Sequence, residues 1–215
     1  RLGAAATVVN VITYSSFLAF ALYPKLLAER KREDITTSLK MVLMFAIPLT
    51  IGGIALSDSY IRMLTDKYVD AAPVLIVLAI DAFVTVISGF YSTVLYGVEN
   101  VDEGSKLSIR QLAKSRLFLV FSLPYLHSLI TIPTAFYLLS NYARGLAFEA
   151  ALYVAIINLV ARFAAFVILY IIVRKMIQMH IPWKTIGKYV LAAATMGIIL
   201  YVIPHPTRTL TTLAE

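Results

Sequence analysis

The sequence predicts an all-α fold, a polytopic membrane bundle of about six transmembrane helices without a soluble domain. The first observation behind this prediction is composition. Of the 215 residues, 60% are hydrophobic and 14% are charged, whereas soluble domains are about 45–50% apolar and about 25% charged. The second is that the apolar residues form long runs, and about 20 such residues in a helix cross a bilayer core of about 30 Å. Helices are expected because lipid offers the backbone no hydrogen-bonding partners.

Six runs have, or approach, the length of a membrane span. They are residues 3–27, 39–56, 72–96, 117–139, 147–173 and 189–203. The first run passes through Pro24 and leads into a basic cluster that ends at Arg32. The fourth contains Pro124 and Pro133, which predict kinks. The last is the weakest, because about fifteen residues make a helix of only about 22 Å, although Trp183 before it is a typical interfacial anchor.

Basic residues alternate between the connections, which predicts the topology. The first, third and fifth loops with their flanks are rich in Lys and Arg, whereas the second, the fourth and the C-terminal tail hold few. Because Lys and Arg are enriched in cytoplasmic loops, we expect the odd-numbered loops in the cytoplasm and both ends of the chain outside. The sequence thus predicts a multi-pass protein of the cell membrane, in contact with membrane lipids. The formal net charge of +7 follows from this pattern, so no nucleic-acid partner is expected.

Motifs of enzymes, cofactors and metal sites are missing from the sequence. It contains no cysteine, no Gly-rich phosphate loop and no HExxH pair. The three histidines fall in three different regions of the predicted topology, so they are not expected to bind one metal ion together. We therefore expect no catalytic residues, no cofactor and no metal.

Polar side chains inside the apolar runs are the candidates for function, since such groups usually face the interior of a bundle or a water-filled cavity. In run 72–96, Asp81, Thr85, Ser88 and Ser92 fall within an arc of about 60° of a helix. The other runs contribute polar residues that likewise share faces with small or polar neighbours. The candidate substrate or cavity residues are Asp81, Thr85, Ser88, Asn158, Arg162, His127, Asn10 and Tyr14.

Asp81 and Arg162 both lie near the middle of their runs, where a charged side chain costs about 2.5–3.5 kcal/mol to insert. Two interpretations stay open. The two residues form one buried ion pair that fixes helix packing, or they line a cavity in which Arg162 attracts an anionic head group and Asp81 balances charge or takes a proton. The sequence leaves open whether they pair. For His127 the alternatives are a proton shuttle and a hydrogen-bonded structural residue.

Residues 3–101 carry a resemblance to a known family. They contain a proline after an apolar helix, an Ile-Pro pair in the next run, and a Tyr-x-x-Ala-x-x-x-Leu stretch at the start of the third. These residues are Pro24, Ile47-Pro48, and Tyr68, Ala71 and Leu75. In these features the chain resembles the polysaccharide-transporter branch of the MOP flippase superfamily, although Asp66-Lys67 stand where that family has a glycine. Beyond residue 101 the similarity is one of layout.

This resemblance implies an exporter of two pseudo-symmetric helical lobes that moves lipid-linked oligosaccharide or polysaccharide precursors by alternating access. The six runs resemble the eighth to thirteenth of its fourteen helices. The implied partners are a lipid-linked glycan as substrate and either a missing N-terminal lobe or a partner subunit. Two alternatives remain: a cation-coupled drug exporter of the same fold with Asp81 as the coupling site, and a non-transporting membrane subunit or scaffold.

Overall fold

The computed structural model describes residues 10, 12–14, 32–59, 72–98, 116–142, 147–176 and 181–202. Within these ranges the structure is all-α and no strand is present. The long helices of the described ranges are α3 (Arg32–Ala55), α5 (Ala72–Val98), α7 (Arg116–Asn141), α8 (Ala147–Met176) and α9 (Trp183–Val202). The predicted fold class is confirmed at this level.

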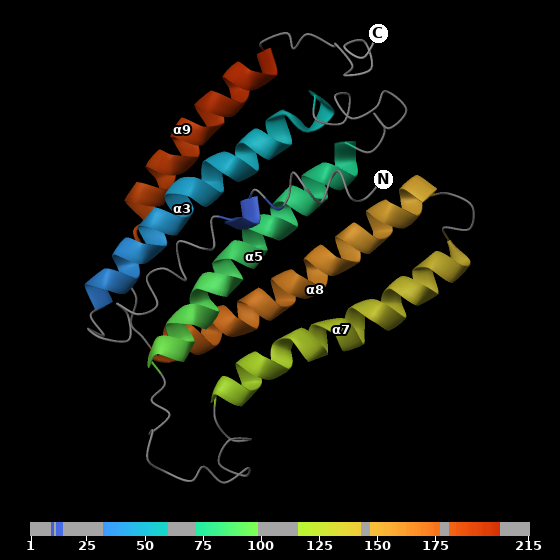
Figure 1. The fold of residues 1–215 in the computed structure, drawn as a ribbon, viewed down its shortest axis with the longest axis horizontal. Helices are drawn as coiled ribbons and strands as arrows, with labels where there is room; N and C mark the ends of the chain where they lie inside the picture. The colour runs from blue at the N-terminus through green and yellow to red at the C-terminus, as the bar shows by residue number, and fades with distance from the viewer. Residues whose placement is uncertain are drawn as a thin grey trace, which may run out of the picture.

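The five helices lie side by side in the order α9, α3, α5, α8, α7 (Figure 1). Successive helices of the chain run in opposite directions, and α9 returns to pack beside α3. As a result, α3, α7 and α9 begin at the same end of the bundle at which α5 and α8 finish. We call this the basic end, because Arg174 and Lys175 in the last turn of α8 and Lys184 and Lys188 early in α9 belong to it. The alternation agrees with the pattern of basic loops in the sequence.

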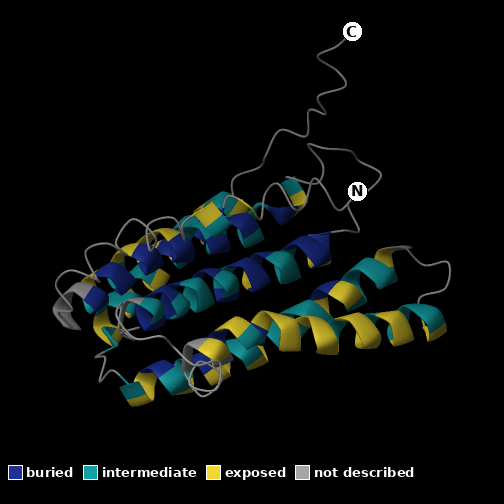
Figure 2. Ribbon diagram, turned by 60° about the horizontal axis from the view of Figure 1, so that its bottom comes forward, coloured by how far each residue is buried: buried dark blue, intermediate teal, exposed yellow. Residues whose placement is uncertain are grey.

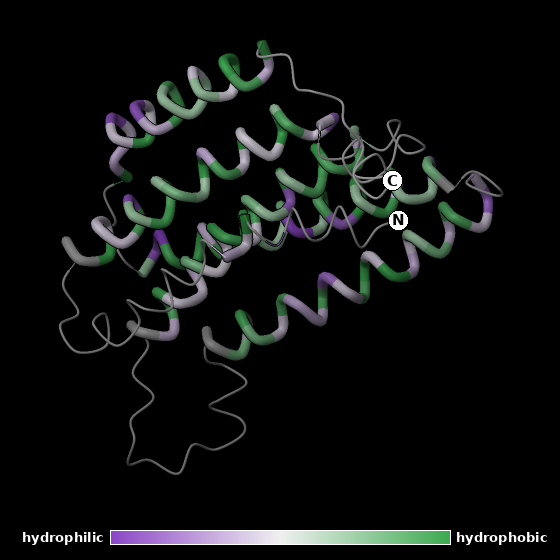
Figure 3. The backbone as a smooth tube through the Cα atoms, turned by 45° about the horizontal axis from the view of Figure 1, so that its top comes forward, coloured by the Kyte–Doolittle hydropathy of each residue, from purple (hydrophilic) through white to green (hydrophobic). Residues whose placement is uncertain are grey.

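Four of the described helices are long and apolar enough to cross a membrane, which makes this a multi-pass membrane protein by length and composition. Their spanning segments are Ile35–Ala55, Ala72–Tyr96, Phe148–Met176 and Trp183–Val202. The first three correspond to the predicted runs 39–56, 72–96 and 147–173. Hydrophobic residues dominate these helices over most of their length (Figure 3).

The last span is longer than the predicted run 189–203. Helix α9 already begins at Trp183 and has 20 residues, so it reaches about 30 Å at about 1.5 Å per residue. The carbonyl of Pro182 accepts hydrogen bonds from the backbone N–H groups of Thr185 (2.9 Å) and Ile186 (3.0 Å) and so starts the helix. Lys184 and Lys188 are exposed on its first turns, whereas the prediction left these charged residues in the preceding loop.

The remaining two predicted runs are less well defined. Run 117–139 forms helix α7, which is continuous through Pro124 and Pro133, but this helix is not among the four candidate spans of the described residues. Of run 3–27, Asn10 and residues 12–14 are described and are helical, and the other residues lie outside the described ranges. The number of six spans therefore stays a prediction.

Helix α5 lies at the centre of the core. Its side chains Val86, Phe90, Val94 and Leu95 are almost completely buried and pack with residues of the other four helices. Burial is greatest on α3 and α5, while α7 and α9 show many exposed residues (Figure 2). Since most of these exposed residues are apolar, they suit a helix surface that faces lipid or another apolar partner.

Helices α3 and α9 approach closely through small residues. Gly197 of α9 is buried, and a Cβ atom added to it would lie 2.8 Å from Cγ2 of Ile51 and 3.9 Å from Cβ of Ala55. Small residues at such crossings let helix backbones come close together, which is a common way of packing in membranes. The seam between α3 and α9 therefore depends on the lack of a side chain at Gly197.

We predict that Gly197→Ala lowers the stability of the fold. Overpacking costs about 1–3 kcal/mol, which exceeds the gain of about 1 kcal/mol in helix propensity. The matched control is Gly187→Ala in the same helix, where an added Cβ meets nothing within 4 Å. Thermal unfolding in detergent should show a lower midpoint for Gly197→Ala and an equal or higher midpoint for Gly187→Ala. Equal midpoints for both variants would contradict the close approach.

Candidate functional site

A polar network joins α5 to α8 within the apolar part of the bundle. The Nε–H group of Arg162 donates to Oδ1 of Asp81 at 2.8 Å, and this contact is also an ion pair. The side-chain amide of Asn158 donates to the second carboxylate oxygen, Oδ2, at 3.1 Å. Asn158 and Arg162 are four residues apart and so share one face of α8. The open question of the sequence is answered: Asp81 and Arg162 pair, and Asn158 completes the coordination of the carboxylate.

Thr85 and Ser88 lie on the same face of α5 as Asp81 but contribute differently. The Thr85 hydroxyl donates to the backbone carbonyl of Asp81 at 2.8 Å, so it satisfies its own helix instead of the carboxylate. The Ser88 hydroxyl is buried and has no hydrogen-bonding partner within the described ranges. Buried polar atoms normally have hydrogen-bonding partners. Among the described residues, the Ser88 hydroxyl is therefore an unsatisfied polar group on this face of α5.

His127 brings α7 to the same region. It lies close enough to Asp81 for the two side chains to interact electrostatically. Its Nε2 atom is buried, and no hydrogen-bonding partner for it occurs in the described part of the chain. The structure thus gathers polar groups from α5, α7 and α8 around Asp81, in agreement with the polar faces predicted for these three segments.

The network is partly accessible from outside the protein. The Asp81 side chain is 11% exposed, whereas that of Arg162 is 32% exposed. Arg162 uses Nε for Asp81, and among the described residues its two terminal nitrogens, Nη1 and Nη2, make no hydrogen bond. Because a guanidinium group has five N–H donors, Arg162 can bind a second acceptor while it holds Asp81.

Asn10 and Tyr14 differ from the network residues in their exposure. Both are exposed, while Ile12 between them is buried against Ala79 and Ala82 of α5. Within the described ranges, the hydrogen bonds of the Asp81 carboxylate involve neither residue. The expectation that they face the same cavity receives no support from these contacts.

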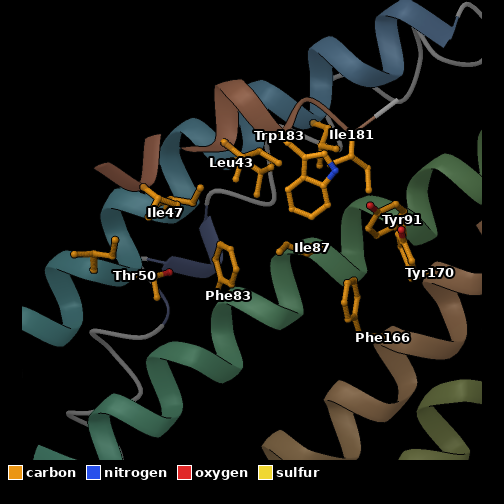
Figure 4. A pocket seen from close by; sticks show the side chains of 14 residues that line it. Leu43, Ile47, Thr50, Phe83, Ile87, Tyr91, Phe166, Tyr170, Ile181 and Trp183 are labelled. Carbon is orange, nitrogen blue, oxygen red and sulfur yellow. The ribbon is translucent and has the colours of Figure 1, made fainter. Parts of the chain in front are cut away.

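Two apolar cavities adjoin the network helices and are not predicted by the sequence. The larger, of about 650 Å³, lies between α3, α5, α8 and the start of α9 (Figure 4). A smaller one, of about 440 Å³, lies between α5 and α8. Neither is lined by Asp81, Asn158 or Arg162. The cavities depend on side chains from helices far apart in the sequence, so the four-residue spacing of lining residues within one helix, such as Phe166 and Tyr170, does not reveal them.

We predict that removing one partner of the ion pair destabilises the protein more than removing both. Arg162→Gln leaves the Asp81 carboxylate without its cation and should cost roughly 1–3 kcal/mol, below the 3–5 kcal/mol of a fully buried pair because Arg162 is 32% exposed. The double variant Asp81→Asn/Arg162→Gln should regain part of this loss, since no uncompensated charge remains.

Thermal unfolding of the single and double variants measures this coupling. Lys175→Gln serves as the control, because Lys175 is an exposed residue of the same helix, and it should leave the midpoint unchanged. Strictly additive effects of Asp81→Asn and Arg162→Gln would show that the two side chains are not coupled.

Comparison with known proteins does not identify the chain. No family model matches it, and neither the curated proteins nor the solved structures that were compared include a match. The four apolar spans and the polar network are therefore the observations from which its function has to be argued.

Proposed function

We propose that this protein is a flippase-like transporter that exports lipid-linked oligosaccharide or polysaccharide precursors across the cell membrane by alternating access. The observation that carries the proposal is the network of Asp81, Asn158 and Arg162 inside apolar helices, with a guanidinium group that is only partly used. The resemblance of the sequence to the polysaccharide-transporter branch of the MOP superfamily supports the same function.

The way in which Asp81 is coordinated favours a binding role for Arg162. Arginine and carboxylate often pair through two parallel hydrogen bonds that use two guanidinium nitrogens. Here Asn158 takes the second carboxylate oxygen, and Arg162 donates from Nε alone. The terminal nitrogens stay available as a planar pair of donors, a geometry that suits the oxygens of a phosphate group.

A lipid-linked sugar carries such a phosphate between its apolar tail and its glycan. In the proposed mechanism, this phosphate binds the terminal nitrogens of Arg162, and the negative charge of Asp81 keeps the site from holding the anion too tightly. Because the same pair joins α5 to α8, phosphate binding alters the contact between these two helices. A ligand shifts a conformational equilibrium only through such a difference in interaction between states.

The proposed transport path needs a second wall. The described helices form an open row (Figure 1), and α7 at its edge exposes large apolar side chains such as Tyr125, Leu129 and Phe136. A second lobe or a partner subunit would close the path, with odd-numbered loops in the cytoplasm. A cation-coupled drug exporter is supported less well, because Asp81 already has a cationic partner.

A second candidate function is a non-transporting membrane scaffold. It is favoured by the ion pair itself, since pairing and packing alone account for two charged residues within apolar helices. The two candidates differ in what they require of Arg162. A scaffold needs its bond to Asp81, whereas the transporter also needs its terminal nitrogens.

Transport of labelled lipid-linked oligosaccharide by the full-length protein in proteoliposomes tests the proposal. We expect Arg162→Gln to abolish transport. Arg162→Lys should lower it by about tenfold or more while the protein stays folded, because lysine keeps the charge but loses the planar pair of donors. The swapped variant Asp81→Arg/Arg162→Asp can restore pairing, and we expect it to regain stability without regaining transport.

Lys175→Gln is again the control and should transport normally. No movement of the lipid by the unmodified protein, or full transport by a folded Arg162→Gln variant, would contradict the proposal. Equal recovery of stability and transport in the swapped variant would show that transport requires only the ion pair and not the terminal nitrogens of Arg162.

A further inference from the structure

The larger cavity is suited in size and lining to an apolar ligand. Its volume of about 650 Å³ lies within the range of about 300–1,000 Å³ that is typical of ligand sites. Its lining is almost entirely apolar and comes from four helices, with Leu43 and Ile47 on α3, Phe83 and Ile87 on α5, and Phe166 on α8 among the residues. None of the lining residues in the described part of the chain is charged, so this lining suits an apolar occupant.

The two ends of this cavity differ in polarity. Figure 4 shows the hydroxyl groups of Tyr91 and Tyr170 and the indole of Trp183 near one another, at the end away from Ile47 and Thr50. The rings of Tyr91 and Tyr170 are in edge contact at 5.9 Å. Trp183 is the first residue of α9, so the polar tips lie toward the basic end of the bundle. An occupant with one polar and one apolar end fits this arrangement.

The length of the cavity matches one leaflet of a bilayer. Its lining on α3 runs from Leu39 to Ile51, twelve residue steps that correspond to about 18 Å of helix. Half of the hydrocarbon core is about 15 Å thick. On α5 and α9 the lining lies between the middle of the span and the basic end, and on α3 it also extends past the middle of the span Ile35–Ala55. The cavity is therefore long enough for an acyl chain of one leaflet.

Helix geometry places two cations beside the polar end of the cavity. Arg174 lies four residues after the lining residue Tyr170 and so follows it on the same side of α8, where it is exposed. Lys40 directly follows Leu39, and at 100° per residue it lies about 50° from the mean direction of the lining residues of α3. Tryptophan is the side chain that typically sits at head-group level, and basic residues there attract anionic lipids.

The geometry points to a binding site for one anionic membrane phospholipid, with an acyl chain in the cavity between α3, α5, α8 and α9 and its phosphate held by Arg174 and Lys40. This site is separate from the network of Asp81 and does not depend on what the protein transports. Because the acyl chain contacts four helices at once, the lipid stabilises their arrangement.

Lipid retention by the purified protein in a neutral detergent tests the site. Phosphatidylglycerol and phosphatidylcholine with the same acyl chains are added separately, and native mass spectrometry counts bound lipid while thermal unfolding reports stabilisation. We expect one tightly retained phosphatidylglycerol and weaker retention of phosphatidylcholine. Arg174→Gln with Lys40→Gln should weaken phosphatidylglycerol retention by roughly tenfold, toward the level of phosphatidylcholine.

Filling the cavity should remove both lipids. Ile87→Trp and, as a second variant in another helix, Val190→Trp place a large ring in the space for the acyl chain. Lys188→Gln is the control, because Lys188 is exposed on a different side of α9 from Trp183, Ile186 and Val190, and it should retain phosphatidylglycerol fully.

Several results would overturn the assignment. Equal retention of the two phospholipids would show that Arg174 and Lys40 do not hold the phosphate. Unchanged retention in a folded cavity-filling variant would show that the acyl chain does not occupy the cavity. Stabilisation by inorganic phosphate alone would show an anion site without a lipid chain. Preference for a polyprenyl phosphate over phosphatidylglycerol would show that the cavity binds a transport substrate instead of a membrane phospholipid. Lipid retention is measured without transport. A negative result for the lipid site therefore does not affect the proposed transport function, which the proteoliposome assay tests separately.

Discussion

The hydrocarbon core of a membrane offers no hydrogen-bonding partners to a carboxylate, and this constraint determines how the centre of the protein is built. Asp81 can stay charged there only if the protein supplies donors. Arg162 and Asn158 supply them from one face of α8. The contact between α5 and α8 is thereby fixed in register, and the remaining helices pack on both sides of these two in a single row.

The polar network and the larger cavity share helices: they use different faces of α5 and successive turns of one face of α8. On α5, Asp81 turns toward α8 and α7, whereas Phe83 and Ile87 line the cavity. On α8, Arg162 of the network and the cavity residues Phe166 and Tyr170 follow one another at four-residue spacing, so they share one face at successive turns. One pair of helices therefore presents a charged, partly accessible site beside an apolar one, which are the two environments that an amphiphilic lipid requires.

The sequence predicts much of this architecture because helix faces are a local property. The run 72–96 and the shared face of Asp81, Thr85 and Ser88 follow from spacing alone, and the span Ala72–Tyr96 agrees with the predicted limits. The pairing of Asp81 with Arg162 joins residues 81 positions apart, so it depends on which helices become neighbours. For the same reason the cavity with Tyr91, Tyr170 and Trp183 was not predictable. Helix α9 was predicted too short because Lys184 and Lys188 were assigned to a loop.

In the proposed site, Arg162 holds Asp81 through Nε while its terminal nitrogens stay available to a phosphate. Nuclear magnetic resonance of protein with ¹⁵N-labelled arginine, in bilayers, tests it most directly, with Arg162→Lys to assign the signals. We expect a hydrogen-bonded Nε signal without ligand, and a shift of the terminal nitrogen signals when lipid-linked oligosaccharide is added. Terminal nitrogens that are already fully hydrogen-bonded without ligand, or that do not respond to it, would contradict this role of Arg162.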